Sequence, residues 1–319
     1  MRLSSSTMIA IVVILLCTLS ASLTALQPDK PQTQFQTRQF FNPELYISSS
    51  NVELPSLLLQ MPNQQEWDNW YKRYGNDFHI YVDPRTGTPT NILGHIPMIP
   101  GNGVGNTLTL QDVSLRLGRQ VQAADTEIVG DLIRQFIQEN QKTFNIDAAQ
   151  MGQIRTAQVT EDLWQISIPQ QINGIPVRYG RIVATISHGN LLLFGTETWS
   201  NVQMDTVARI SPQRALEIGF AYAGGRQPHD RLWKEPVLEV IPYAPAEFQA
   251  GEGFAGPIGK GISHRLVWTF GFMRDPDPGR WETIVDAQNE ELLAFQDTNQ
   301  YVSQKIVGAV YPLTSTEVC

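Results

Sequence analysis

Cysteine is nearly absent from this 319-residue sequence, in which Cys17 and Cys319 are the only two. Cys17 lies in an apolar N-terminal segment, so loss of that segment would leave one thiol and no internal disulfide to stabilise the fold. The remaining thiol, Cys319, indicates either pairing outside the chain or a precursor that has been cut short.

Positive charge is also scarce. Lys and Arg number 23 against 31 Asp and Glu, which gives a net charge of −8, and no stripe of basic residues runs along the chain. A nucleic-acid backbone repels such a chain, so we expect no nucleic-acid partner. The hydrophobic share of 42% is nevertheless typical of a globular protein, and the length allows more than one core.

Motifs of catalysis are missing as well. The sequence has no His-Glu-x-x-His, no Gly-x-Ser-x-Gly and no phosphate-binding glycine loop before a helix. The Gly-rich run from Gly101 follows two prolines and is interpreted as a loop. No two histidines lie four residues apart; they are His79, His95, His188, His229 and His264. We therefore expect no catalytic residue, no metal site and no enzymatic activity in this chain.

The N-terminus has the layout of a signal peptide. Arg2 precedes an apolar run, Met8 to Leu19, and small residues follow it. The pattern predicts a signal peptide over residues 1–25, cleaved after Ala21 or Ala25, and an extracellular or periplasmic protein without a stable membrane span. The alternative is an uncleaved anchor, for which the apolar run is short.

Two segments precede the regular part of the chain. Residues 26–62 are rich in Pro and Gln without periodicity, which predicts a linker. Residues 63–118 predict an extension made of a helix over Gln64 to Tyr74, capped by Asn63, and a hairpin. The hairpin corner is Asp83 to Gly87, where Pro and Gly favour a turn.

The remaining sequence predicts two units in a row, each a helix followed by an antiparallel meander. Helical periodicity begins at Asp125 in residues 119–206 and at Ser211-Pro212 in residues 207–298, and alternating strands follow each helix. An amphipathic sheet must cover its apolar face, so each helix is expected to pack on its own sheet. The predicted fold class is therefore α+β, with two small modules, or three if the extension forms its own. Each module is an antiparallel β-meander on an amphipathic helix.

Three hairpins share one pattern of alternating strands around a polar turn, at Asp83, His188 and Asp286. Asp286 is expected to bond the backbone of its own turn. Antiparallel sheets of this kind present edges with which other chains can pair, so the sequence indicates binding rather than catalysis.

The stretch from Gly174 to Gly195 resembles the hairpin of the propeptide module called FTP, which fungalysin- and thermolysin-type secreted metalloproteases share. Tyr179 stands where the pattern has the first glycine of a pair. The matching residues are Gly174, Pro176, Val177, Gly180, Val183, Gly189 and Gly195.

The second unit resembles the PepSY domain that follows FTP in such precursors, and this resemblance implies a cystatin-like or PepSY-like fold. Where the pattern has Thr-Gly the chain has Asn289-Glu290, and Asn289 is expected to take the left-handed conformation of the glycine. The matching residues are Leu266, Trp268, Trp281, Val285, Asp286, Ala287 and Glu291. Residues 299–319 are similar to the junction and the first strand of a mature protease, and the likeness covers Ala123 to Pro312.

The resemblance implies the propeptide of a secreted zinc metalloprotease. It would act as intramolecular chaperone and inhibitor of a catalytic domain in cis, and that domain is absent from this sequence. Zinc, and calcium as well, would belong to that missing domain. The segment implied to block the protease and to be processed contains Phe295, Asp297, Thr298, Tyr301 and Lys305. The alternative is a stand-alone secreted inhibitor or protein-binding module of PepSY type.

Overall fold

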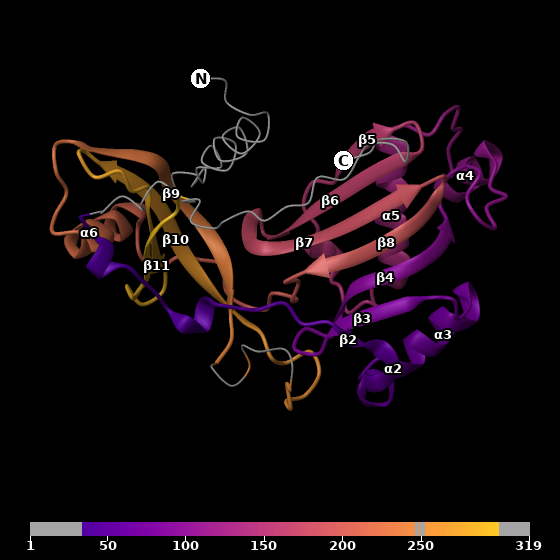
Figure 1. Ribbon diagram of the computed structural model, residues 1–319, viewed down its shortest axis with the longest axis horizontal. Coiled ribbons are helices and arrows are strands. Elements are labelled where there is room, and N and C mark those ends of the chain that lie inside the picture. Colours follow the sequence, from indigo (N-terminus) through magenta and orange to yellow (C-terminus); the bar gives the residue numbers. More distant parts are fainter. Residues whose placement is uncertain (1–33, 246–247, 249–252, 300–319) are drawn as a thin grey trace, which may run out of the picture.

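Two lobes lie side by side in the computed structural model, which describes residues 34–245, 248 and 253–299 (Figure 1). The described strands join in one 12-stranded arrangement, and apart from one parallel contact all their pairings are antiparallel. The α+β class predicted from the sequence is confirmed. The signal-peptide residues, including Ala21 and Ala25, and the C-terminal Tyr301 and Lys305 lie outside the described residues.

The first lobe has seven strands in the spatial order β5-β6-β7-β8-β4-β3-β2. They are β2 (Val52–Glu53), β3 (His79–Asp83), β4 (Thr88–Pro97), β5 (Arg155–Thr160), β6 (Leu163–Ile172), β7 (Ile175–Ser187) and β8 (Asn190–Glu197). Its helices are α2 (Leu54–Leu57), α3 (Gln64–Tyr74), α4 (Leu110–Leu117) and α5 (Thr126–Asn140), with short 3₁₀ turns η3 (Leu58–Gln60) and η4 (Ala148–Gln150).

The second lobe has five strands in the order β9-β10-β11-β12-β1, covered by one helix. The strands are β1 (Phe40–Phe41), β9 (Asp230–Tyr243), β10 (Ser263–Arg274), β11 (Trp281–Asp286) and β12 (Leu292–Asp297). The helix is α6 (Pro212–Tyr222), and η1 (Gln36–Arg38) and η2 (Pro43–Leu45) are 3₁₀ turns. The lobes meet where β7 runs parallel to β9, with Val177 opposite Val240.

The helices α5 and α6 begin at the predicted caps. The side chain of Asp125 accepts from the backbone N–H of Ile128 at 2.9 Å, and Ser211 accepts from Arg214 at 3.1 Å. Asn63 occupies the predicted N-cap position of α3, but its side chain makes no capping bond, because its amide donates instead to the carbonyls of Lys142 and Thr143. Asn63 therefore ties α3 to the end of α5 rather than closing its own helix.

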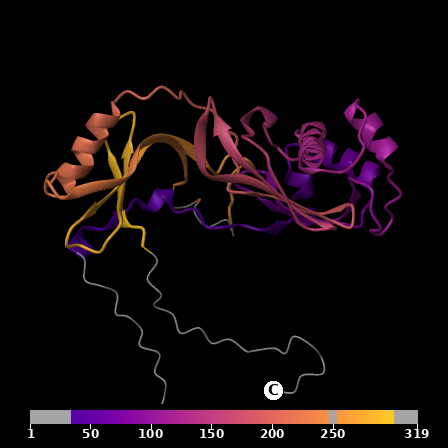
Figure 2. The same cartoon turned by 90° about the horizontal axis from the view of Figure 1, so that it is seen from above.

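Burial follows the alternation of the strands. On β7, Ile182, Ala184 and Ile186 are at most 1% exposed and face the helices, whereas Arg181, Val183 and Thr185 point to the other side. The largest core lies between the first sheet and its helices and includes Trp67, Trp70, Phe136, Phe144 and Phe194. Figure 2 shows the helices of both lobes on one side of the molecule. The opposite face of the first sheet is not packed against any described helix.

Residues 63–118 do not form a third module. β3 pairs with β4, and β4 pairs with β8, so the extension completes the first sheet. Its Trp67 and Trp70 lie in the same hydrophobic core as Phe136 of α5. The chain therefore has two sheet-plus-helix units, and the extension belongs to the first.

The linker predicted for residues 26–62 is wrong over its described part. Residues 34–53, which we call the strap, run from the second lobe to the first (Figure 1). Phe35 is 2% exposed and contacts Trp281 edge-on at a ring distance of 5.1 Å. β1 then pairs with β12, and β2 pairs with β3. The prediction failed because apolar residues of the strap contact partners in distant elements, as Phe35 contacts Trp281, and follow no local period.

The turn after β11 differs from the prediction in one residue. Asp286 accepts from the N–H groups of Gln288 at 2.7 Å and Asn289 at 3.2 Å, so the expected turn bond is confirmed. The positive φ of 66° lies at Glu290, however, and not at Asn289. The Asn289 side chain accepts from the N–H of Glu291 across this position, and Arg214 binds both oxygens of Glu290.

Candidate docking site between the lobes

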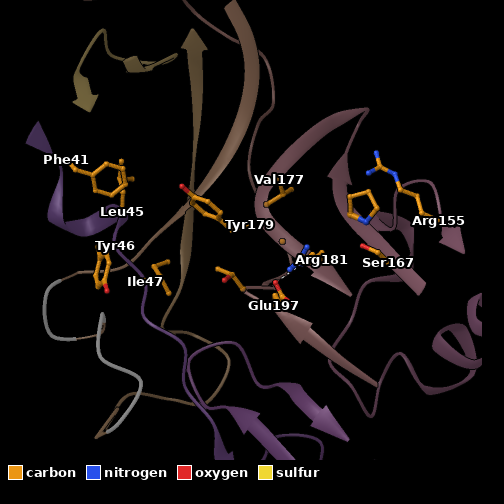
Figure 3. Close-up of a pocket in the computed structure, with 13 residues that line it drawn as sticks. Phe41, Leu45, Tyr46, Ile47, Arg155, Ser167, Val177, Tyr179, Arg181 and Glu197 are labelled. Carbon is orange, nitrogen blue, oxygen red and sulfur yellow. Dashed lines mark hydrogen bonds and ion pairs between the residues drawn. The ribbon is translucent and has the colours of Figure 1, made fainter. Parts of the chain in front are cut away.

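A cleft of about 740 Å³ lies where the strap passes the ends of β6, β7 and β8 (Figure 3). Phe41, Leu45, Tyr46 and Ile47 of the strap form one wall, and β7 contributes Val177, Tyr179, Gly180 and Arg181. Arg155, Ser167, Pro169, Glu197 and Thr198 complete the lining. The cleft is half apolar and half polar in the groups it presents, which suits a protein segment better than a purely apolar ligand.

Tyr179 has a strained backbone within this cleft. Its φ is 69°, a conformation that is a genuine outlier for a bulky side chain, and its side chain is 53% exposed. The neighbouring Gly180 lies against Gln170, since a Cβ there would stand 2.3 Å from the Gln170 Oε1. Strain of this kind persists only where the surroundings enforce it, and it concentrates at functional positions.

Arg178, next to Tyr179, enters a buried ionic network of the second lobe. Its guanidinium donates to both oxygens of Glu282, at 2.9 and 2.8 Å, and to Glu239 at 2.8 Å. Lys234 lies 3.1 Å from both carboxylates and balances the charge. Because Arg178 belongs to β7 and the other three residues to β9 and β11, the network joins the lobes beneath the cleft.

Charge compensation decides the protonation of this network. Burial by itself would raise the pKa of Glu282, but hydrogen bonds and charge from Arg178, and then from Lys234, outweigh it and hold the pKa below its ordinary 4.5. Burial likewise opposes the charge of Arg178, and Glu282 and Glu239 raise its pKa above the ordinary value. Arg178 and Glu282 are therefore charged at neutral pH.

The rim of the cleft carries two arginines, of which one forms an ion pair and the other does not. Arg181 pairs with Glu197 at 2.6 Å, and both side chains are about half exposed. Arg155, the first residue of β5, is exposed, and no ion pair or hydrogen bond joins its side chain to another described residue. The rim thus offers one unpaired positive charge.

Beyond the cleft, the helix-free face of the first sheet continues as a partly exposed surface. Outward residues of neighbouring strands share it, among them Leu93 of β4, which is 38% exposed, and Val183 of β7. β5 forms one edge of this sheet, pairs only with β6 among the described strands, and is almost wholly exposed. A sheet face and a free edge in continuity are features of protein-binding surfaces.

The predicted hairpin residues of the first unit lie together around β7. The structure explains why three of these positions are glycines. Gly174 (φ 79°) and Gly189 (φ 87°) form the turns at the two ends of β7. Gly180 lines the cleft with Val177, while Pro176 is an exposed residue of the same strand. Only Val177 and Gly180 of the predicted motif therefore reach the candidate site, and the turn glycines support the hairpin.

The predicted residues of the second unit serve its core and not the cleft. Trp281 stacks on Phe295 at 5.0 Å, Trp268 donates to the Ile210 carbonyl at 3.0 Å, and Ala287 is fully buried. Arg265 binds Asp286 at 3.3 Å and Glu291 at 2.9 Å. These side chains hold the turn between β11 and β12 in place.

The inhibitory segment predicted from Phe295 onward is wrong at its start. Phe295 is fully buried in β12, and Asp297 accepts from the backbone N–H of Arg280 at 3.0 Å. Thr298 also bonds Arg280 through its backbone N–H at 2.8 Å. Phe295 and Asp297 therefore belong to β12, where the aromatic core of the second lobe holds Phe295, and Thr298 is bonded to Arg280 directly after the end of the strand.

The histidines do not gather. In the described part of the chain no group of three or more His, Cys, Asp and Glu side chains is placed to hold a metal ion. His264 lies beside a second, more polar cleft of about 430 Å³ at the lobe junction, together with Lys260 and Tyr243. Burial lowers the pKa of His264 from 6.5 to about 4, so it is neutral at pH 7.

Most residues that shape the cleft and the ionic network beside it could not be recognised from the sequence. Arg178, Glu239 and Glu282 are scattered polar residues on alternating strands, and nothing local marks them as partners. Tyr179 was noted as a departure from a glycine pattern, and its positive φ is what that departure signalled. The strap residues carried no signal because their segment resembled a linker.

None of the helices among residues 34–245 and 253–299 is long and apolar enough to cross a membrane. No family model and no curated protein matches the sequence. Among solved structures, the chain is similar to the Bacillus megaterium YpeB C-terminal domain, with 12% identity and a TM-score of 0.27 over 74% of this chain and 96% of that domain. A TM-score this far below 0.5 does not establish a common fold, so no function is carried over from that domain.

Proposed function

We propose that this chain is a non-catalytic docking module for the catalytic domain of a secreted zinc metalloprotease and acts as its propeptide. The observation that carries the proposal is the helix-free face of the first sheet, which ends in the cleft beside Tyr179. A face that presents apolar, polar and charged groups together suits another protein's surface. The resemblance of the two sheet units to propeptide modules supports the same partner.

In this proposal the sheets provide a preformed surface on which the slow, non-local contacts of the partner assemble. Covalent attachment raises the effective concentration of a docked domain to about millimolar for a short linker, so even weak contacts would hold it. Cleavage of the connection would remove this advantage and release the active enzyme. Any zinc or calcium would belong to the partner.

The test mixes the purified chain with the zinc metalloprotease domain encoded on the same precursor or beside it. We expect binding by calorimetry, inhibition of peptide hydrolysis, and a higher yield of active enzyme when denatured protease refolds in the presence of the chain. Peptide hydrolysis by the chain alone, or absence of binding, inhibition and refolding assistance together, would overturn the proposal.

The second candidate is a stand-alone secreted inhibitor or binding module. The hydrophobic cores favour it. All four hydrophobic clusters consist of described residues of this chain and are formed without a partner. The two functions differ in how they depend on linkage. A free inhibitor acts fully at stoichiometric concentration in trans, whereas a detached propeptide still inhibits but needs a higher concentration than the linked one, because it has lost the effective concentration that linkage provides.

A further inference from the structure

We infer that the cleft between strap and β7 is a peptide-docking site for an extended segment of the partner protein that carries a carboxylate beside an apolar side chain. The inference rests on the proposed function in that it takes the occupant to be a protein. It goes further by naming the residues of this chain that recognise the partner and the interactions that they make. Arg155 would bind the carboxylate, and Tyr46 and Tyr179 would enclose the apolar side chain.

Charge is the first argument. The cleft is lined by three charged residues, of which Arg181 and Glu197 neutralise each other at 2.6 Å. Arg155 remains without a partner among the described residues, so the cleft carries one net positive charge in a chain whose total is −8. A guanidinium at a partly apolar rim binds a carboxylate through two parallel hydrogen bonds, which favours Asp or Glu in the occupant.

Preorganisation is the second argument. Tyr46 is 66% and Tyr179 is 53% exposed, and both line a cleft whose remaining apolar side chains come from Phe41, Leu45, Ile47, Pro169 and Val177. The Tyr179 backbone at φ 69° is held between the Arg178 network and Gly180. A rigid aromatic side chain contributes contact area without losing much conformational freedom on binding, so this strained position suits an anchor.

The third argument is the backbone geometry of β5. This edge strand begins at Arg155 and continues through Thr160, with exposed residues and no proline. Arg155 is its single charged residue, and its one irregularity, a bulge between Gln158 and Thr160, lies at the opposite end, so the edge near Arg155 has little of what usually protects such strands. An extended segment that adds to β5 would therefore reach the cleft with its side chains at the level of Arg155.

A phage-displayed heptapeptide library selected on the full chain tests the inference, followed by synthetic fluorescent versions of the enriched peptides. We expect enrichment of Asp or Glu beside an aliphatic or aromatic residue. Arg155→Glu should weaken binding of these peptides at least about tenfold and remove the acidic preference, because like charges would then face each other. Arg226→Glu is the matched control, since Arg226 is an exposed arginine that follows α6 in the second lobe and does not line the cleft, and it should change binding less than about twofold.

Enrichment without acidic residues, or equal binding by the wild type and Arg155→Glu, would overturn the inference. So would a concentration-dependent dimer in light scattering that Arg155→Glu abolishes, because β5 would then pair with a second copy. The proposed function is tested separately by the protease. A protease that binds the wild type and Arg155→Glu equally refutes only this docking site, whereas peptides that bind while no metalloprotease does would refute only the choice of partner.

Discussion

Arg178 of β7 donates two nearly parallel hydrogen bonds, of 2.9 and 2.8 Å, to the carboxylate of Glu282 in β11. The Arg178 side chain is 13% exposed and that of Glu282 is 8%, so this pair is largely withdrawn from water. The backbone pairing between the same two lobes has a single register pair, Val177 with Val240. The side-chain network therefore contributes much of the orientation of one lobe relative to the other.

Glu282→Gln is expected to destabilise the protein strongly. It leaves Arg178 and Lys234 facing only Glu239, and removal of one partner from a buried pair typically costs about 3–5 kcal/mol. Urea unfolding followed by tryptophan fluorescence measures the loss. The double variant Arg178→Met, Glu282→Leu keeps the charges balanced and should lose less than Glu282→Gln. A double variant as unstable as the single one would contradict the role of charge.

Stability should fall between pH 6.5 and pH 4 because of His264. Burial lowers its pKa from 6.5 to about 4, so in this interval the unfolded state binds a proton that the folded state does not. The shift corresponds to on the order of 2–3 kcal/mol of stability, present above pH 6.5 and lost as the pH falls to 4. The free energy of unfolding as a function of pH measures it.

His264→Gln should remove most of the decrease in unfolding free energy between pH 6.5 and pH 4. A further decrease at lower pH should remain. Glu282, whose pKa is held below 4.5, contributes stability above its ordinary pKa and loses it as the pH falls below that value. The variant should therefore still unfold in stronger acid. A wild type whose stability is flat from pH 7 to pH 4.5 would refute the assignment to His264.

Gly189→Val is expected to destabilise the β7–β8 hairpin more than Gly174→Val does. Both glycines have positive φ, which costs about 1–2 kcal/mol for an L-residue. A Cβ at Gly189 would also lie 2.6 Å from the carbonyl oxygen of Ile99, whereas nothing lies within 4 Å of one at Gly174. The difference in melting temperature between the two variants isolates the steric part. Equal melting temperatures would contradict the packing of the loop at Ile99 against the turn.

Tyr179→Gly should raise stability slightly or leave it unchanged while weakening binding in the cleft. Strain at a left-handed non-glycine residue is about 1–3 kcal/mol, and its relief offsets the greater freedom of glycine in the unfolded state. Tyr179→Phe keeps the backbone strain and the ring, and serves as the control. Calorimetric melting and peptide affinity are measured together. A clear loss of stability in Tyr179→Gly would show that the ring serves the fold.

Phe35→Ala should cost about 3–5 kcal/mol, since it opens a cavity beside Trp281 and Phe295. The strap also carries the matched control Tyr46→Ala, whose exposed side chain contributes little to the core. Guanidinium unfolding measures the free energy of unfolding of both variants. A loss in Phe35→Ala alone would show that the strap is packed into the fold. If both substitutions are neutral, residues 34–53 are not part of the stable fold.

Local signals in the sequence were sufficient for most helices and hairpins. Asp125 and Ser211-Pro212 begin helices because their side chains and ring act on backbone groups within three residues. The turns at Gly87 and Gly189 follow from the left-handed conformation that glycine adopts at little cost. Such features depend on neighbours in the chain, so a pattern of residues predicts them.

Errors arose where a distant partner decided the outcome. Asn63 bonds carbonyls about eighty residues away, and Glu290 is held by Arg214. Phe295, predicted to lie in an exposed processing segment, is buried between Trp281 and Phe35. For each of these residues the local sequence suggests one structure, but a contact with a distant element stabilises another.

Local patterns in the sequence were enough to predict the α+β class, the alternation that buries Ile182 and exposes Arg181, and the positions of the turns, because periodicity and turn chemistry act over a few residues. Three-dimensional packing was needed to show that the extension joins the first sheet, that the strap connects the lobes, and that Tyr46, Tyr179 and Arg155 line one cleft. These outcomes depend on packing and charge pairing between residues far apart in the chain, for which sequence spacing carries no signal.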